Sequence, residues 1–161
     1  MEENCRHWNL YLGDNLMTMP QNISPRLLEI VDALPLKNGI RILEIGCGPG
    51  VAAREIANRI ENGFVLAIDR SAKAIEQAQK NSYKEISSGK LKFILSKIEE
   101  FELPPNEKPF DFAFATRVGA LDGRHPEIEK LALKRIAKAL KKSGRLFIDG
   151  GNPLKEILLI D

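Results

Sequence analysis

The segment Gly46–Gly50 reads Gly-Cys-Gly-Pro-Gly and has the residue types of a ligand-binding loop. The β-rich run 41–45 precedes it, and apolar residues recur at helical spacing in 51–60 after it. Glycine has no Cβ, so such a loop turns sharply and lets a ligand lie against the main chain near a helix N-terminus. The pattern therefore predicts a bound small molecule between a strand and a helix.

A carboxylate stands at the corresponding place on the next strand. Asp69 follows the apolar run 64–68 and lies 23 residues after Gly46, a spacing typical of units in which an acidic side chain accepts hydrogen bonds from a ribose diol. The loop has the spacing G-x-G-x-G rather than the dinucleotide spacing G-x-G-x-x-G, and Glu44 adds a negative charge beside it. This anion disfavours a pyrophosphate and favours a cationic ligand such as S-adenosylmethionine, which carries an ammonium and a sulfonium.

Alternating helical and extended segments must position these residues, and this alternation predicts an α/β fold with a parallel sheet. The acidic connection 99–109 leaves only a short helix, or none, between two of the strands. Apolar periodicity and capping residues predict helices over 25–34, 51–60, 71–86 and 126–140, and strands over 41–45, 64–68, 91–95, 110–115 and 145–149.

Length and composition narrow the class of protein. The 161 residues suffice for one domain, which we expect over 24–161, after an N-terminal arm formed by 1–23. Hydrophobic residues at 43% and charged residues at 29% exclude a disordered or fibrous chain, and a net charge of +2 argues against a dedicated nucleic-acid binder. The absence of a long apolar run and of a signal-like start predicts a cytoplasmic protein without membrane insertion. The two cysteines and two histidines have no metal-ligand spacing, so no metal is expected.

Several segments together resemble class I S-adenosylmethionine-dependent methyltransferases. Residues 43–50 (LEIGCGPG) resemble the first motif of that family and 67–71 (AIDRS) its second, while 110–115 and 140–148 resemble its fourth strand and the entry into its fifth. The resemblance covers roughly residues 25–149. It implies a Rossmann-like, doubly wound sheet with helices on both faces, S-adenosylmethionine as cofactor, and in-line transfer of a methyl group to a small-molecule acceptor.

The resemblance also implies which residues hold the cofactor. The methionine part would lie along the glycine loop, the ribose hydroxyls on Asp69, and the adenine beside Arg70, with Ile98 on its other side. Two residues after the fourth strand would meet both cofactor and substrate, chiefly through backbone groups. The cofactor-binding set is thus Glu44 for the amino group, Gly46, Cys47, Gly48, Gly50, Asp69, Arg70, Ile98, Thr116 and Arg117.

Two departures from the family pattern bear on this prediction. Lys97 stands where the family often has an aspartate that bonds the adenine amino group, so this contact must come from main chain or another residue. The family sheet usually continues past its fifth strand with two further strands, whereas only 12 residues follow Asp149 here. We therefore expect about five strands, a fifth strand near the sheet edge, and possible pairing of two copies through that edge.

Acceptor-side residues are less well defined by the sequence. Asp122, Arg124 and His125 follow the fourth strand, where ligands collect in such sheets, although Asp122-Gly123 also reads as a turn with solvated neighbours. His125 is the candidate general base because its unperturbed pKa is near physiological pH. Trp8 and Tyr11 are candidates for a lid over the acceptor, with packing on the first helix as the alternative. Cys47 is expected to serve by its size and backbone rather than as a nucleophile.

Two other functions stay open at this stage. A nicotinamide-dependent oxidoreductase would bind NAD at the same loop. A cofactor-binding module without catalysis, acting as a partner or regulatory subunit, is suggested by the missing edge strands and by the lack of an Asn-Pro-Pro-Tyr type of motif after Ala115.

Overall fold

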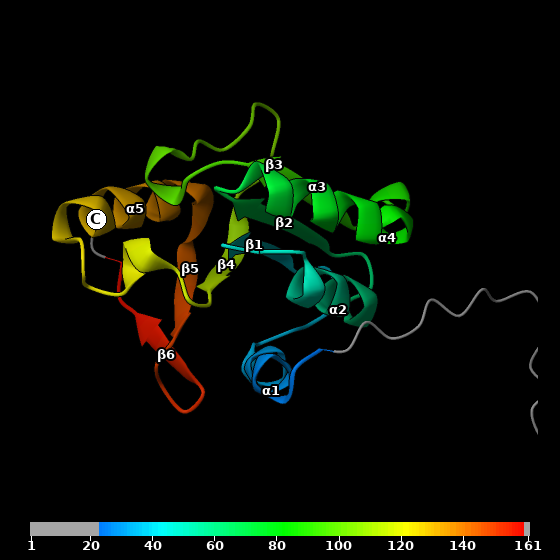
Figure 1. The fold of residues 1–161 in the computed structure, drawn as a ribbon, viewed down its shortest axis with the longest axis horizontal. Helices are drawn as coiled ribbons and strands as arrows, with labels where there is room; N and C mark the ends of the chain where they lie inside the picture. Colours follow the sequence, from blue (N-terminus) through cyan, green and yellow to red (C-terminus); the bar gives the residue numbers. More distant parts are fainter. Residues whose placement is uncertain (1–22, 160–161) are drawn as a thin grey trace, which may run out of the picture.

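The structure, a computed structural model, describes residues 23–159 (Figure 1). Residues 1–22 of the predicted N-terminal arm, with Trp8 and Tyr11, lie outside the described residues. The helices are α1 (Pro25–Ala33), α2 (Val51–Arg59), α3 (Ala72–Asn81), α4 (Tyr83–Ser87) and α5 (Pro126–Ala139), with short 3-10 turns η1 (Ile98–Glu100) and η2 (Gly119–Leu121). The strands are β1 (Arg41–Ile45), β2 (Phe64–Asp69), β3 (Leu91–Leu95), β4 (Phe110–Ala115), β5 (Leu140–Asp149) and β6 (Leu154–Ile157).

The strands form one sheet in the order β3-β2-β1-β4-β5-β6. All neighbours from β3 to β5 pair in parallel, and β6 pairs with β5 in antiparallel fashion. The chain builds outward from β1 to β3 and then returns to place β4 on the other side of β1. The sheet order thus reverses between β1 and β4, and ligands of such sheets bind beyond the carboxyl ends of the strands at this point.

The two faces of the sheet carry separate cores. Ile42 of β1 packs in the core covered by α1, α2 and α3, whereas its neighbour Leu43 packs in the core covered by η1 and α5. Successive residues of a strand point to opposite faces, so strands buried on both sides are apolar almost throughout. In Figure 1, α5 lies on the opposite side of the sheet from α1 and α2. The structure confirms the predicted doubly wound α/β fold.

Local sequence explains the first helix. The hydroxyl of Ser24 accepts a hydrogen bond from the backbone N–H of Leu27, and Pro25 occupies the first turn. Proline suits this position because the first N–H groups of a helix have no intrahelical partner. Ile30 and Val31 then bury the inner face of the helix, as the apolar spacing predicts.

The prediction of one helix over 71–86 is wrong at its middle. The helix breaks at Ser82, which separates α3 from α4 and is fully buried. Its hydroxyl accepts a hydrogen bond from the guanidinium of Arg54 in α2, a tertiary contact that no local pattern encodes.

The predicted edge of the sheet is also corrected. The register passes from the pair Leu140/Phe110 to the pair Arg145/Phe112, so β5 begins earlier than predicted and contains an irregular segment. After β5 the chain turns back and forms β6, which pairs Leu154 with Asp149. The sheet therefore has six strands rather than five, and β5 is an interior strand. Its edge is not open for pairing with a second copy, because β3 and β6 form the two edges.

Residues 23–159 show neither a membrane-spanning helix nor a cluster of metal ligands. No helix in this part of the chain is long and apolar enough to cross a membrane. The same residues contain no group of three or more His, Cys, Asp or Glu side chains that could hold a metal ion.

Candidate functional site

The glycine loop leaves β1 at the carboxyl end of the sheet and enters α2. Gly46, Gly48 and Gly50 all have left-handed backbone conformations, with φ of 72°, 53° and 80°. The N–H groups of Gly46 and Cys47 donate to the carbonyl of Ile68 on the neighbouring strand, at 2.8 and 3.0 Å. The loop is therefore attached to the end of β2 by backbone hydrogen bonds.

The three glycines differ in what a side chain at each position would contact. A Cβ on Gly46 would lie 2.6 Å from Cγ2 of Val118, which comes from the segment after β4, and a Cβ on Gly50 would lie 2.8 Å from the ring of Phe93. A Cβ on Gly48 would meet no atom within 4 Å. Gly46 thus accommodates the segment after β4, Gly50 allows close packing between α2 and β3, and Gly48 is needed only for its conformation.

Asp69 holds the loop from the end of β2. One carboxylate oxygen accepts a hydrogen bond from the N–H of Gly48 and the other accepts one from the N–H of Ser71, both at 2.8 Å. A carboxylate oxygen has two lone pairs, so each oxygen can accept one further hydrogen bond. The side chain therefore shapes the loop and the start of α3 and retains acceptor capacity toward a diol.

Glu44 lies beneath the same loop and is 3% exposed. Its Oε2 atom is buried and has no hydrogen-bond partner among the described residues. Burial raises the pKa of this carboxyl group from 4.5 to about 8, and the negative charge of Asp69 acts in the same direction. The charge of Arg54 and a backbone hydrogen bond from Ala53 act in the opposite direction. An acceptor without a donor is costly in a protein interior, so a ligand cation that reached Oε2 would satisfy it.

Arg54 supports the loop from α2. Its guanidinium is buried and donates from Nη1 to the carbonyl of Pro49 at 2.9 Å and to the hydroxyl of Ser82 at 3.0 Å. Burial lowers the pKa of this group, while the charges of Glu85 and Glu44 oppose that shift. One side chain therefore connects the glycine loop to the break between α3 and α4.

Cys47 is buried, and its thiol lies 3.6 Å from the carbonyl oxygen of Gly48. Burial raises the pKa of the thiol far above its usual value, and the charges of Glu44 and Asp69 raise it further. The thiolate is the nucleophilic form of cysteine, so this thiol is unreactive at neutral pH. This environment agrees with a packing role for Cys47.

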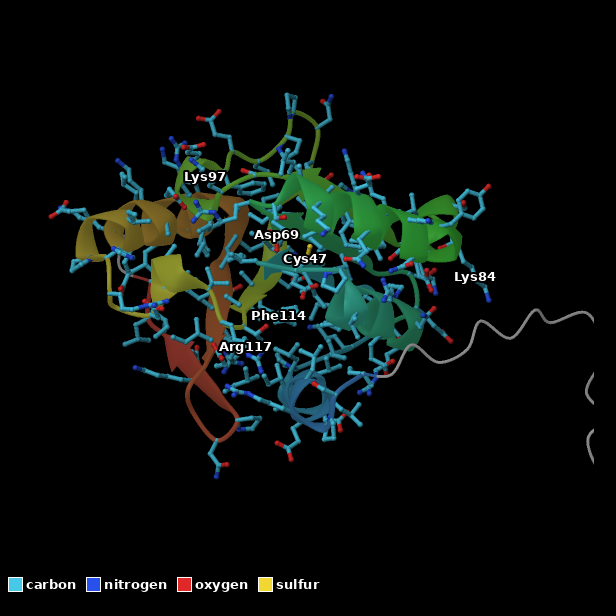
Figure 2. All side chains as sticks on the ribbon, in the orientation of Figure 1. Cys47, Asp69, Lys84, Lys97, Phe114 and Arg117 are labelled. Carbon is cyan, nitrogen blue, oxygen red and sulfur yellow. The ribbon has the colours of Figure 1, made fainter. Side chains whose placement is uncertain are left out.

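A cavity of about 430 Å³ lies over the carboxyl ends of the strands. Figure 2 shows Asp69 near the centre of the molecule, with Lys97 on one side and Arg117 on the other, and all three line this cavity. Seven predicted site residues contribute to its wall, namely Gly46, Asp69, Arg70, Ile98, Arg117, Arg124 and His125. Segments far apart in the sequence are thus brought together at one site.

The other predicted residues lie elsewhere. Glu44, Cys47, Gly48 and Gly50 do not line the cavity and form the loop and its support instead. Two smaller cavities adjoin the site, one of about 150 Å³ that includes Thr116 and one of about 240 Å³ that includes Asp122. Arg117 lines all three cavities and therefore stands where they meet.

Several lining residues are absent from the sequence-based set. Ser96 and Glu99 follow β3, Val118 follows β4, and Ile128 lies in the first turn of α5. Their signal in the sequence is only that they come after predicted strands or at a helix start. A systematic reading of every segment that follows a parallel strand would have included the first three.

The predicted acceptor-side residues differ in what they contact: two of them pair with each other, and the third lines the large cavity. Asp122 and Arg124 form an exposed ion pair with 2.6 Å between Oδ2 and Nη2, and each holds the other's pKa toward its charged form. They therefore partner each other on the surface, which fits the predicted turn. His125 is exposed, precedes the first turn of α5 and lines the large cavity. Of these residues, His125 is the available titratable group at the cavity.

Comparisons with known proteins agree with this fold. The family model described as a methyltransferase domain matches residues 36–158. The O-methyltransferase rstn1 of Aspergillus nomiae is 31% identical over 135 residues, which are 81% of this chain and 57% of that protein. The 27-O-demethylrifamycin SV methyltransferase of Amycolatopsis mediterranei is 29% identical over 89% of this chain and 50% of its own length.

A solved structure gives the same result. The phosphoethanolamine N-methyltransferase 2 of Haemonchus contortus, in complex with S-adenosyl-L-methionine, superposes with a TM-score of 0.61 and 27% identity, over 76% of this chain and 27% of that one. The chain belongs to the methyltransferase-domain family. It spans only about half the length of the curated relatives named above.

Proposed function

We propose that the 430 Å³ cavity binds S-adenosylmethionine and that the protein transfers its methyl group to a small-molecule acceptor. The observation that carries this proposal is the buried, unpartnered Oε2 of Glu44 beneath a glycine loop that Asp69 holds in place. The names of the rifamycin relative and of the solved phosphoethanolamine enzyme each contain a small-molecule acceptor, which supports the choice of acceptor class.

The residues present fit this cofactor. The cavity volume lies within the range of about 300 to 1,000 Å³ that small-molecule sites occupy. Glu44 does not line the cavity itself, but Ile45 and Gly46, which directly follow it, do, and we assign the ammonium of the methionine part to its unpartnered carboxylate. Such a cation favours the ionised form of Glu44 and offsets the cost of burying its charge.

The nucleoside part is assigned to the other end of the cavity. Asp69 would accept the ribose hydroxyls with its remaining lone pairs, while Ile98 and the stem of Arg70 would enclose the adenine. Glu99 also lines the cavity and has the carboxylate that position 97 lacks. We assign to Glu99 the hydrogen bond from the adenine amino group.

The reaction needs positioning more than a catalytic residue. When bound, the sulfonium would supply an activated methyl group. The acceptor atom would form a bond to the methyl carbon in line with the breaking carbon–sulfur bond, S-adenosylhomocysteine would leave, and the acceptor would lose a proton. Holding the reactants in a near-attack geometry supplies much of the rate enhancement in such transfers. His125 lines the cavity and would take the proton where the acceptor requires a base. Val118, which packs against Gly46 at the cavity wall, would help to exclude water from the cavity.

Calorimetric titration tests the cofactor assignment. Wild-type protein should bind S-adenosylmethionine and S-adenosylhomocysteine but not NAD, and binding at pH 7 should release close to one proton because Glu44 becomes ionised. Titrations in buffers of different ionisation enthalpy measure the number of protons that binding releases. Glu44→Gln should lose the proton release and bind more weakly, whereas Glu55→Gln, on the outer part of α2, should match the wild type. Binding of NAD alone would overturn the proposal.

A second assay distinguishes an enzyme from a binding module. The protein is incubated with methyl-labelled S-adenosylmethionine and a panel of small molecules, proteins and RNAs, and labelled product is measured. Product from a small molecule supports the proposal. Normal cofactor binding with no product from any acceptor would favour the non-catalytic module instead. We also propose that the protein is located in the cytoplasm. The buried free thiol of Cys47 is compatible with the reducing conditions of that compartment.

A further inference from the structure

Arg117 has a backbone conformation that is rare for its residue type. It lies two residues after the end of β4 with φ of 56°, in the left-handed region. Such a conformation is unfavourable for a residue with a side chain and persists where its surroundings impose it. Here the N–H of Arg117 donates to Oδ1 of Asp149 at 3.1 Å, which fixes the backbone and directs the residue to the meeting point of the three cavities.

The guanidinium of Arg117 also has no partner within residues 23–159. In that part of the chain, the other arginines except Arg70 are engaged by carboxylates, hydroxyls or carbonyls, namely Arg26, Arg41, Arg54, Arg59, Arg124, Arg135 and Arg145. The two unpartnered guanidinium groups both line the 430 Å³ cavity. Arg70 is assigned to the adenine end, which leaves Arg117 as the unpaired cation on the other side of Asp69 (Figure 2).

The carboxylates that line the two smaller cavities with Arg117 are already engaged by other groups. The 150 Å³ cavity is lined by Arg26, Arg117 and Asp149 as its charged groups. Asp149 is already engaged, because one oxygen accepts from Nη2 of Arg26 at 3.2 Å and the other from the backbone of Arg117. In the 240 Å³ cavity, Asp122 is engaged by Arg124. The nearby carboxylates therefore do not neutralise the guanidinium of Arg117.

We propose that Arg117 binds an anionic group of the methyl acceptor, a carboxylate or a phosphate, and so selects acidic acceptors. A planar guanidinium donates two parallel hydrogen bonds to such groups, which gives orientation as well as affinity. The position suits this role, since Arg117 joins the cofactor cavity to two smaller ones that would receive the rest of the acceptor. This inference rests on the proposed function and adds the acceptor class to it.

The test uses protein saturated with S-adenosylhomocysteine, so that the cofactor site is filled. Inorganic phosphate and, in a second arm, acetate are titrated at constant ionic strength against chloride, with backbone amide NMR shifts as the readout. The wild type should show saturable binding of at least one anion, and the two arms distinguish a phosphate from a carboxylate site. Arg117→Gln should weaken that binding about ten-fold or more, and Arg117→Lys less, because a lysine keeps the charge but loses the two-pronged geometry.

Arg145→Gln is the matched control, because Arg145 is an exposed arginine of β5 that pairs with Glu156 and lines none of the three cavities. It should bind the anion as the wild type does. The inference is overturned if the loaded wild type binds neither anion, or if Arg117→Gln binds as tightly as the wild type. It is also overturned if Arg117→Gln weakens S-adenosylhomocysteine alone, since the guanidinium would then serve the cofactor's own carboxylate. Wild-type protein that binds phosphate through Arg117 but does not bind S-adenosylhomocysteine overturns the proposed function and retains the anion site.

Discussion

The carboxylate of Asp69 and the backbone N–H of Gly48 are 2.8 Å apart and form a hydrogen bond between the end of β2 and the loop after β1. The second oxygen of the same carboxylate accepts from Ser71, so this group joins the loop, the strand end and the start of α3. A sequence motif at the end of a strand would suggest a ligand contact alone. The structure adds that the loop conformation itself depends on this side chain.

Replacement of Asp69 should therefore affect both binding and stability. Asp69→Ala should weaken S-adenosylmethionine binding by about ten-fold to a few hundred-fold, because charge-assisted hydrogen bonds contribute roughly 1.5 to 3 kcal/mol each. It should also lower the free energy of unfolding by about 1 to 2 kcal/mol, since two backbone N–H groups lose their acceptor. The cofactor affinity and the free energy of unfolding of Asp69→Asn should lie between those of the wild type and Asp69→Ala. Calorimetry and urea unfolding measure the two effects.

Asp32→Ala is the control for Asp69→Ala, because it removes a surface carboxylate of α1 that pairs with Arg59. Such exposed pairs contribute about 1 kcal/mol or less, and no change in cofactor affinity is expected. Unchanged affinity in Asp69→Ala would show that the ribose lies elsewhere.

The buried carboxyl group of Glu44 should make stability depend on pH. Its pKa is raised from 4.5 to about 8 in the folded protein. Between these values the folded state holds a proton that the unfolded state has released, so the free energy of unfolding should fall as pH rises from about 5 to about 8 and level off above that. The slope approaches about 1.4 kcal/mol per pH unit for one proton. Urea unfolding of the ligand-free protein across this range measures it.

Other groups also titrate, so the informative quantity is the difference between wild type and Glu44→Gln. The two proteins should have similar stability near pH 5, and the wild type should become the less stable of the two toward pH 8. Glu55→Gln, which lacks a surface carboxylate of α2, should run parallel to the wild type. A constant difference between wild type and Glu44→Gln would show that Glu44 ionises normally in the folded protein.

The sequence predicts the central strands well because their burial has a simple signature. Residues 64–69 and 110–115 are apolar at all but one position each, 41–45 have three apolar residues of five, and the structure buries all three strands between two helix layers. Ser24 and Pro25 likewise mark the start of α1 through local contacts. These elements depend on properties of neighbouring residues, which a sequence displays directly.

The missed features depend on partners far along the chain. At the break between α3 and α4, Ser82 accepts a hydrogen bond from Arg54, which is 28 positions away in the sequence. The strand β6 forms because a four-residue segment pairs with the edge of β5. At the site, the glycine loop and Asp69 had recognisable spacing, whereas Glu99 and Val118 belong to segments without periodicity. Their position at the cavity follows from the strand order, which brings the segments after β3 and β4 to the same edge of the sheet.

The contact between Gly46 and Val118 gives a steric prediction. Gly46→Ala combines an unfavourable backbone conformation with a Cβ that would lie 2.6 Å from Cγ2 of Val118, so it should push Val118 away and weaken cofactor binding. Gly48→Ala has a similar φ but open space around its Cβ, so it should cost only about 1 kcal/mol of stability. Gly46→Ala should cost about 1 to 3 kcal/mol more.

A double-mutant cycle separates the two causes at Gly46. In a Val118→Ala background the clash is removed, so Gly46→Ala should cost there about the same as Gly48→Ala. Unfolding free energies of the four proteins supply the coupling term. Equal costs of Gly46→Ala in both backgrounds would mean that Val118 does not restrict this position.

The last prediction concerns the adenine end, where Glu99 and Glu100 offer a matched pair. Glu99 lines the large cavity, whereas Glu100 is absent from its lining and pairs with Lys97 at 3.5 Å. If Glu99 accepts the hydrogen bond from the adenine amino group, Glu99→Gln should weaken S-adenosylhomocysteine binding about three- to ten-fold, because the amide keeps an acceptor but loses the charge. Glu100→Gln should bind normally. The inosine analogue of S-adenosylhomocysteine has a carbonyl oxygen in place of the amino group, which the carboxylate of Glu99 would repel and a glutamine amide could donate to, so Glu99→Gln should not weaken binding of this analogue. Equal weakening of both ligands by Glu99→Gln would assign Glu99 a general electrostatic effect on the cavity, and the adenine contact would then have to come from the main chain around Ile98.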